Sequence, residues 1–212
     1  MRHFARTETK KETMNFLKRI FGKKETENKV SKGLVENEFN QNSDEESYGI
    51  EKENSHQRAI ELIPEEFFWS CVDELAPFGS DEGDTALSEF RDWRKNNPNE
   101  ETYECLKWTI EGISEQNISF YNKKILDRTE IKERIADENF DDQQFIFTVD
   151  ISVIATGFGQ LVDEGKIDLK NKPIIQLAID RQKIWAELSE HWEHRNEYIE
   201  NLNVLNRALK VA

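Results

Sequence analysis

Cysteine is scarce in this chain, and its placement argues against two kinds of site. There are two cysteines among 212 residues, and their spacing fits neither a CxxC pair nor a disulfide framework. Cys71 and Cys105 both fall in stretches with helical apolar spacing. We therefore expect reduced thiols buried in the core of a cytoplasmic protein.

Motifs for catalysis and for nucleotide binding are missing as well. The sequence contains no GxSxG, no GxxxxGK[ST], no GxGxxG and no zinc spacing of cysteine and histidine. No uninterrupted apolar run reaches the length of about 18 residues that a membrane span needs. Charges interrupt the short apolar segment near the N-terminus, so no signal peptide is expected. The sequence predicts no cofactor.

Basic residues are few, and they gather at one end. The chain has 29 Lys and Arg against 43 Asp and Glu, a formal net charge of −14. Residues 1–33 hold ten basic residues against four Glu, so this segment carries +6 and the remainder carries −20. An acidic surface repels phosphates, so nucleic-acid binding is not expected. It attracts a basic protein partner and speeds the encounter, although such a charge also serves solubility alone.

The first 55 residues lack the pattern of a folded domain. Residues 14–24, MNFLKRIFGKK, form a basic amphipathic segment. Its apolar residues fall on one side of a short helix: Phe16, Leu17, Ile20 and Phe21. This predicts weak contact with an anionic membrane surface or a partner groove, and the alternatives are a frayed tail or a helix that packs on the body. Residues 22–55 are polar and predict a disordered acidic linker, while Met14 is an alternative start.

From residue 56 onward, apolar residues recur at helical spacing. We predict an all-α fold, with a single helical domain of about seven helices over residues 56–212 and a flexible N-terminal tail before it. One helix is expected between Pro64 and Pro77, with both Phe67 and Cys71 on its apolar side. Residues 96–99, NNPN, are expected to end one helix and cap the next.

Residues 145–154, FIFTVDISVI, fit two patterns. Phe147, Val149, Ile151 and Val153 alternate as in a strand. A helical period that starts at Phe147 continues for four turns, and Gly165 is a natural helix end. A lone strand would have no sheet partner in this chain, so we predict a buried helix.

Residues 77–94, PFGSDEGDTALSEFRDWR, place three acids after a turn. Asp81, Glu82 and Asp84 are residue types that bind Ca²⁺ or Mg²⁺. The stretch does not fit an EF-hand, because Gly83 is at the third position and the twelfth residue is not Glu. Capping by Ser80 or Asp81, with acids in the positively charged first turn, explains the same residues without a metal.

The same region holds the hypothetical binding residues. Tryptophan and arginine are frequent binding anchors, so the DWR segment is a candidate recognition patch, and the alternative is a core tryptophan between solvated charges. The binding set is Asp73, Glu74, Asp81, Glu82, Asp84, Arg91, Trp93 and Arg94. No catalytic residue and no metal ligand is assigned.

Two further groups have alternative interpretations. Glu187, His191 and His194 would share a face if the chain is helical there, as in a transition-metal site, or they are surface residues near a helix break. Asp150 lies in an apolar run and must find a partner, such as Arg181, if it is buried. A buried structural pair and a catalytic acid both fit this pattern.

Residues 61–94, ELIPEEFFWSCVDELAPFGSDEGDTALSEFRDWR, resemble the uncharacterised bacterial YfeS-type proteins, some of which are labelled MolR-like regulators by association. The residues that carry this resemblance are Phe67, Phe68, Trp69, Asp73, Glu74, Pro77, Phe78, Gly79, Asp81, Glu82, Gly83 and Trp93. It implies a bacterial cytoplasmic protein, and it carries over no activity and no catalytic residue. The regulator label conflicts with the acidic body.

Two hypotheses of function follow. The first is a non-catalytic protein-interaction module, of an immunity or regulatory type, that binds a basic partner such as a toxin. The second is a metal-binding domain or an enzyme that uses the acids of residues 73–84. Regulation through nucleic acid would require the basic tail to act alone.

Overall fold

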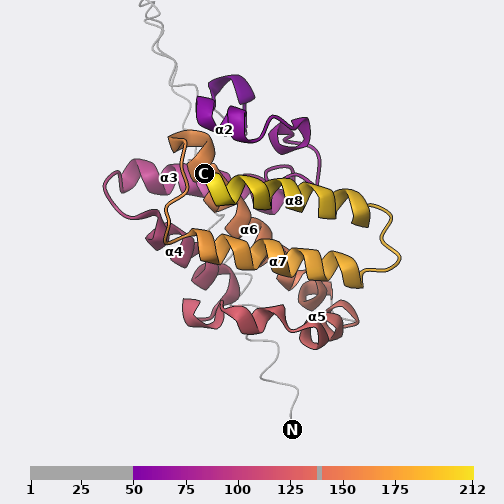
Figure 1. Cartoon of the computed structure of the whole chain (residues 1–212). Coiled ribbons are helices and arrows are strands. Elements are labelled where there is room, and N and C mark those ends of the chain that lie inside the picture. The colour runs from indigo at the N-terminus through magenta and orange to yellow at the C-terminus, as the bar shows by residue number, and fades with distance from the viewer. Residues whose placement is uncertain (1–49, 138–139) are drawn as a thin grey trace, which may run out of the picture. The chain divides into compact units, whose positions relative to one another are not determined.

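The computed structural model describes residues 50–137 and 140–212, and in these residues it contains seven α-helices, four short 3-10 helices and no strand (Figure 1). The predicted all-α class is confirmed. The α-helices are α2 (Gln57–Leu62), α3 (Asp81–Asn96), α4 (Thr102–Ser114), α5 (Arg128–Ile135), α6 (Phe140–Glu164), α7 (Lys172–Leu188) and α8 (Arg195–Val211). The amphipathic segment with Phe16, Leu17, Ile20 and Phe21, together with Met14, lies outside the described residues.

Part of the expected linker is folded. Ile50 is buried, and Lys52–Asn54 form a 3-10 turn that precedes α2. The Lys52 ammonium lies 2.6 Å from a Glu66 carboxylate oxygen, which ties this turn to the segment after α2. The packed unit therefore includes residues upstream of residue 56.

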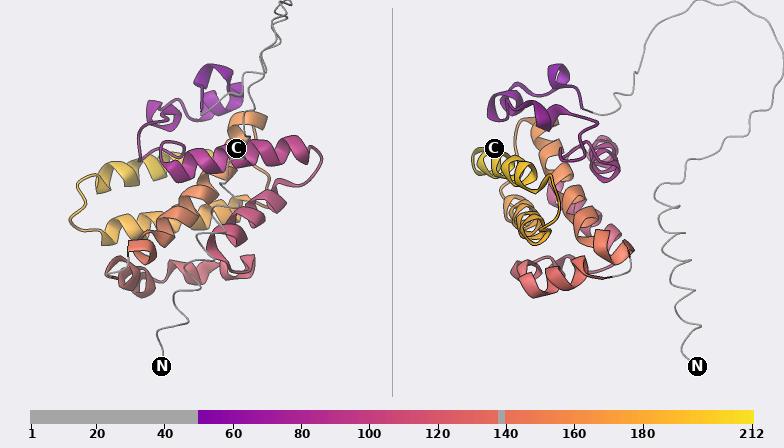
Figure 2. Two further views of the ribbon diagram at one scale, coloured as in Figure 1. Left: turned by 180° about the vertical axis from the view of Figure 1, so that it is seen from behind. Right: turned by 90° about the vertical axis from the view of Figure 1, so that its right-hand side faces the viewer.

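Helix α6 is the centre of the described unit. It contacts α3 and α4 on one side and α7 on the other, and α8 packs against α7 (Figure 2). Residues 149–162 are all buried, so α6 is covered around its whole circumference. This explains its apolar composition and its ambiguous period, because a helix buried on every side shows no polar face. The predicted helix is confirmed, and it ends at Gly165, which has a φ of 71°.

The stretch Phe145–Glu164 is long and apolar enough to cross a membrane, with a mean hydropathy of 1.7. In the structure, however, 83% of it is buried inside the protein. Its composition is accounted for by its place between α3, α4 and α7. Neighbouring helices approach it closely, since a Cβ at Gly159 would come within 3.0 Å of Leu87 on α3.

The helix expected between Pro64 and Pro77 does not form. Only one 3-10 turn, Glu66–Trp69, is present, and turns follow it. The Ser70 hydroxyl accepts hydrogen bonds from the amides of Val72 and Asp73. These side-chain bonds offer the backbone an alternative to helix. As a result Cys71 is exposed rather than in the core, whereas Cys105 is buried as predicted.

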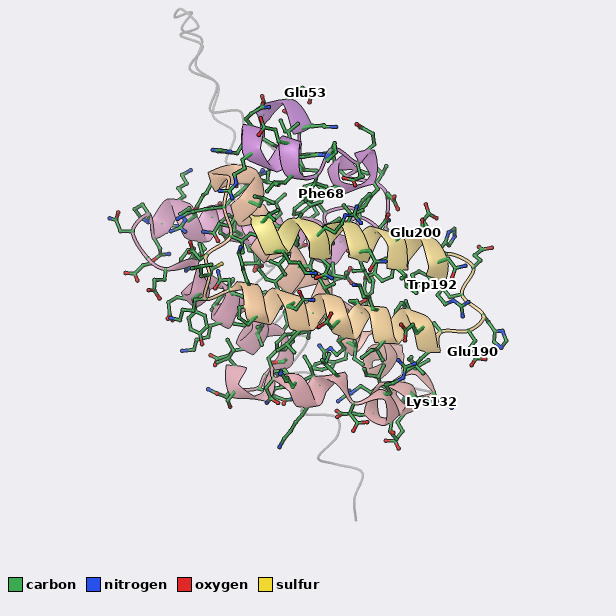
Figure 3. All side chains as sticks on the ribbon, in the orientation of Figure 1. Glu53, Phe68, Lys132, Glu190, Trp192 and Glu200 are labelled. Carbon is green, nitrogen blue, oxygen red and sulfur yellow. The ribbon has the colours of Figure 1, made fainter. Side chains whose placement is uncertain are left out.

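Aromatic packing fixes this irregular segment. The buried ring of Phe68, labelled in Figure 3, makes edge-to-face contacts with Trp69, Phe78 and Phe158, at centroid distances of 4.9, 5.3 and 5.8 Å. Phe158 belongs to α6, so the contact anchors the segment on the core helix. Such pairs stabilise by about 0.5–1.5 kcal/mol each beyond the buried area. The position of the turn before α3 is therefore well determined by its neighbours.

The predicted cap at the start of α3 is confirmed, whereas the predicted cap of the next helix is not. Ser80 caps α3, Pro173 lies in the first turn of α7, and residues 189–194 separate α7 from α8. Asn97 follows α3 as predicted, but α4 begins at Thr102, and the residue before it, Glu101, makes no side-chain cap. The prediction that residues 96–99 cap the next helix is therefore wrong.

Candidate functional site

The chain reverses direction just before α3, and local hydrogen bonds shape the reversal. The Asp73 carboxylate accepts from the Leu75 amide at 2.9 Å. A Cβ at Gly79 would lie 1.9 Å from the Asp73 carbonyl oxygen, so only glycine permits this close approach. The Ser80 hydroxyl then accepts from the Gly83 amide at 3.2 Å and begins the helix. Asp73 thus shapes the turn, and its carboxylate is engaged there.

The other acids of this region point toward solvent around the start of α3. Three are exposed and one is half-buried, and none makes a side-chain hydrogen bond or ion pair within residues 50–137 and 140–212: Glu74, Asp81, Asp84 and the half-buried Glu82. Helix position alone explains three of them, because carboxylates in a first turn are stabilised by the helix dipole. The predicted helix start is confirmed.

An aromatic side chain lies next to three of these acids. A shallow depression of about 250 Å³ is lined by Glu74, Asp81, Glu82 and the ring of Phe147 on α6, with Gly79 and Ser80. Val72 precedes it in the chain, with 83% of its surface exposed. We call the set Val72, Glu74, Asp81, Glu82 and Asp84 the α3-start surface.

The two arginines of the predicted binding set, Arg91 and Arg94, lie further along α3 and contact acids of α6. Arg91 makes two hydrogen bonds of 3.0 Å to the Asp163 carboxylate, from Nε and from an Nη. Arg94 Nε lies 2.7 Å from a Glu164 oxygen, near enough for an ion pair but poorly aligned for a hydrogen bond. Both arginines therefore join α3 to the end of α6. Trp93 is half-buried, with the Arg94 guanidinium 5.1 Å from its ring centroid.

Ion pairs elsewhere on the described surface neutralise many of the other acids. Arg128 pairs with Glu187 and Arg207 with Glu65, at 2.6 and 3.2 Å. Lys170 pairs with Glu101 at 2.8 Å. The four carboxylates of the α3-start surface have no such cation among the described residues, and they lie close together in the sequence.

The described residues contain no group of three or more His, Cys, Asp or Glu side chains placed to hold a metal ion. Glu187, His191 and His194 are not on one helical face, because α7 ends at Leu188 and α8 begins at Arg195. This part of the structure therefore gives the metal-binding alternatives no support.

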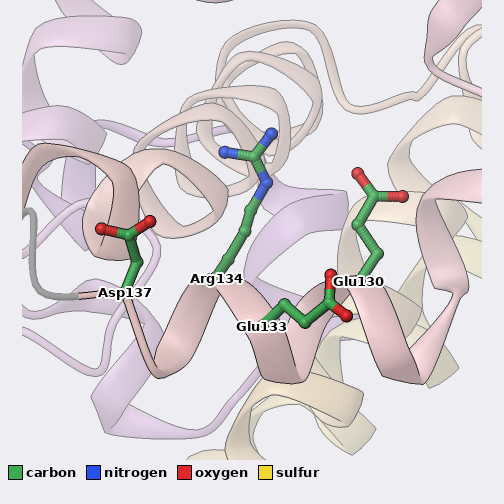
Figure 4. A pocket seen from close by; sticks show the side chains of 4 residues that line it. All are labelled: Glu130, Glu133, Arg134 and Asp137. Carbon is green, nitrogen blue, oxygen red and sulfur yellow. The ribbon is translucent and has the colours of Figure 1, made fainter.

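A further depression lies over α5. Figure 4 shows its lining residues, Glu130, Glu133, Arg134 and Asp137. The Arg134 guanidinium lies 4.9 Å from the centroid of the Phe145 ring, so this side chain serves to hold α5 against α6. The surrounding acids alone specify no ligand.

A buried polar network fills the space between α6 and α7. Asp150 has no exposed surface and Arg181 only 4%, and the two share hydrogen bonds of 2.8 and 2.6 Å. Gln182 donates to Asp150 at 3.0 Å, and the Tyr121 hydroxyl donates to it as well. The Tyr198 hydroxyl in turn donates to Gln182 at 3.0 Å. The predicted Asp150–Arg181 pair is confirmed, whereas its further partners Gln182 and Tyr121, and Tyr198 beyond them, were missed.

The pKa shifts and the burial of this network indicate a structural role. Burial, and after it the neighbouring Asp150 side chain, raises the pKa of Tyr121, and burial also raises the pKa of Tyr198. Burial opposes the charge of Arg181, but the Asp150 carboxylate raises its pKa above the ordinary value. Each carboxylate oxygen of Asp150 has a donor, and the group has no exposure through which a substrate would reach it. Asp150 is therefore a buried structural acid.

Sequence reasoning missed one surface residue. Trp108 on α4 is 45% exposed, because it lies off the apolar side on which Leu106 and Ile110 are buried. The sequence did contain an indication of this exposure. Glu104 and Glu111 lie four residues before and three residues after Trp108, so the tryptophan shares a helical face with charged residues.

Comparison with known proteins finds a distant relative. The chain is distantly similar to the uncharacterised protein YfeS of Escherichia coli (strain K12). The two are 26% identical over 145 residues, which are 68% of this chain and 57% of YfeS. The chain thus matches little more than half the length of this relative. No protein-family model matches the chain, and no solved structure matches it.

The resemblance predicted from residues 61–94 is confirmed by this match. The similarity to YfeS brings no activity, no ligand and no catalytic residue with it. The function is accordingly argued from the surface of this chain.

Proposed function

We propose that this protein is a non-catalytic protein-interaction module that binds a basic segment of a partner protein at the α3-start surface. One observation carries the proposal: four carboxylates within residues 74–84 have no cation among the described residues, and three of them line a depression together with Phe147. An immunity-type role and a regulatory role both use such binding.

Charge supports a basic partner. The chain outside residues 1–33 carries a net −20, and its field raises the rate at which a positively charged protein arrives. Lysine or arginine at the α3-start surface would relieve the mutual repulsion of its carboxylates. Exposed charges contribute only about 0–1 kcal/mol per pair, so apolar contact with Val72 and the Phe147 ring is needed for affinity.

The partner chemistry also fits the shape of the surface. The depression is shallow and lined chiefly by carboxylates, whereas pockets for small molecules are enclosed and mostly apolar. A peptide segment with basic residues and one or two apolar residues would cover both the acids and the exposed valine.

The test uses a Lys/Arg-rich peptide with interspersed leucines, titrated by calorimetry and by NMR at low and at physiological ionic strength. We expect amide shifts concentrated in residues 70–86 and affinity that falls as salt rises. Shifts spread evenly over all exposed acids, or no binding at low salt, would contradict the proposal.

A pair of charge-matched variants sharpens this test. In the first, the four acids of the α3-start surface become amides: Glu74→Gln, Asp81→Asn, Glu82→Gln and Asp84→Asn. In the control, four exposed acids elsewhere become amides: Glu53→Gln, Glu115→Gln, Glu190→Gln and Glu200→Gln. Both variants change the net charge equally, so only a specific site makes the first bind the peptide more weakly than the control. Circular dichroism confirms that α3 remains folded.

A further inference from the structure

The ring of Trp108 is unusual among the five tryptophans of the chain. Trp69, Trp93, Trp185 and Trp192 each contact another ring or a cation. Trp108 is 45% exposed, and in the described part of the chain its ring has no such contact and its indole N–H has no acceptor. An amphipathic ring left half in water without a partner is typical of a binding anchor.

Glutamates flank this ring along α4. Glu104 and Glu111 lie four residues before and three residues after Trp108, on the same face of the helix. Glu104 is exposed, and Glu111 accepts a hydrogen bond of 3.0 Å from the Ile118 amide. Lys107 lies about 100° around the helix from Trp108, and no ion pair joins it to either glutamate among the described residues. The face around the indole is therefore aromatic and negative.

Near the start of α4, a lysine from another part of the chain already lies against an aromatic ring and a glutamate. The Lys170 ammonium lies 3.9 Å from the centroid of the Tyr103 ring and 2.8 Å from a Glu101 carboxylate oxygen. The hydrogen bond to Glu101 raises the pKa of Lys170. An aromatic ring in the first turn of α4, with the glutamate that precedes the helix, thus binds an ammonium from another part of the chain.

We propose that Trp108, with Glu104 and Glu111, binds a lysine or arginine side chain of a partner protein. The cation would stack on the indole face, where the ring quadrupole attracts it, and the two carboxylates would supply charge from either side. The inference goes beyond the α3-start surface: it concerns a different helix, and it stands or falls independently of that surface.

The test compares Trp108→Leu and Trp108→Phe, titrated with the same Lys/Arg-rich peptide. Leucine keeps an apolar side chain but removes the π system, whereas phenylalanine keeps a weaker one. We expect Trp108→Leu to lose about tenfold in affinity, Trp108→Phe to lose less, and the indole N–H signal of Trp108 to shift on titration of the parent protein. Trp192→Leu is the control, because the Trp192 ring already packs against Trp185 and Tyr198, and it should bind as the parent does.

A second peptide isolates the cation. In it, citrulline replaces arginine and norleucine replaces lysine, so the shape is kept and the charge is lost. Equal affinity for the two peptides, an unshifted indole signal, or parent-like binding by Trp108→Leu would each overturn the inference. Self-association that Trp108→Leu abolishes, seen by sedimentation, would also overturn it, since the occupant would then be a second copy of the chain.

The outcomes separate the two proposals. If the amide variant of the α3-start surface loses peptide binding and Trp108→Leu does not, the proposed function stands and this inference fails. The reverse result retains the Trp108 site and removes the α3-start surface.

Discussion

Replacing Asp150 with alanine is the most demanding test of how this fold is held together. The carboxylate accepts hydrogen bonds from Arg181, Gln182 and Tyr121 between α6 and α7. Asp150→Ala removes the negative charge and leaves the guanidinium of Arg181, only 4% exposed, without a counterion. The variant also leaves the amide of Gln182 and the hydroxyl of Tyr121 without their acceptor.

The expected cost follows from that buried charge. Removing one partner of a buried ion pair costs about 3–5 kcal/mol, a large part of the roughly 5–15 kcal/mol that stabilises a typical domain. For a domain of this size the melting temperature should fall by about 6–20 °C. The double variant Asp150→Leu with Arg181→Met should recover part of the loss, because no buried charge then remains.

The assay is urea unfolding followed by circular dichroism and tryptophan fluorescence, with free energies compared at constant m-value. Glu187→Gln is the matched control, because Glu187 forms a similar pair with Arg128 at the surface, and its loss should cost less than about 1 kcal/mol. A loss below about 1 kcal/mol for Asp150→Ala, or a double variant less stable than Asp150→Ala alone, would refute the reasoning.

Three further predictions concern the cap, the thiols and the tyrosines. Ser80→Ala should lower the unfolding free energy by about 1 kcal/mol, while Ser80→Asp keeps the cap, as urea titration would show. A thiol reagent should modify Cys71 at once and Cys105 only on unfolding, because burial raises the pKa of Cys105 to about 12; two fast thiols would be inconsistent with this. The raised pKa values of Tyr121 and Tyr198 imply stability that is complete below the unfolded tyrosine pKa of about 10 and is lost as pH rises above it. Tyrosinate absorbance that appears for both residues in the native protein near that pH would contradict this.

The sequence was enough to predict the fold class, because the helical spacing of apolar residues and the residues that begin or end helices gave the same helix limits. Ser80 and Pro173 mark helix starts through chemistry that acts within one turn, so a single sequence is enough to find them. Asp150 is a similar case, because a charge inside an apolar run requires a cation, and Arg181 lay on an apolar face that could face it.

The segment from Pro64 to Pro77 shows where such reasoning fails. Its apolar residues have helical spacing, yet Ser70 and Asp73 bind nearby amides and Phe68 packs on α6, so local bonds and a tertiary contact override the period. The spacing cannot show this, because it counts apolar residues without regard to what they contact.

The candidate site was predictable only in part. The acids near the start of α3 were found because they are adjacent in sequence. The ion pairs of Arg91 and Arg94 were not, because their partners Asp163 and Glu164 lie far along the chain. Trp108 was missed because a tryptophan is expected in the core, and only the structure shows on which side of α4 its ring lies.

The position of α6 has a consequence for synthesis of the chain. The ribosome releases α3 and α4 before this central helix and α7 and α8 after it, so one side of α6 stays uncovered until α7 has been synthesised. During that interval the Asp150 carboxylate has no guanidinium to bind. A chain interrupted before residue 172 would thus expose a long apolar surface, the kind that chaperones bind and that drives aggregation of unfinished proteins.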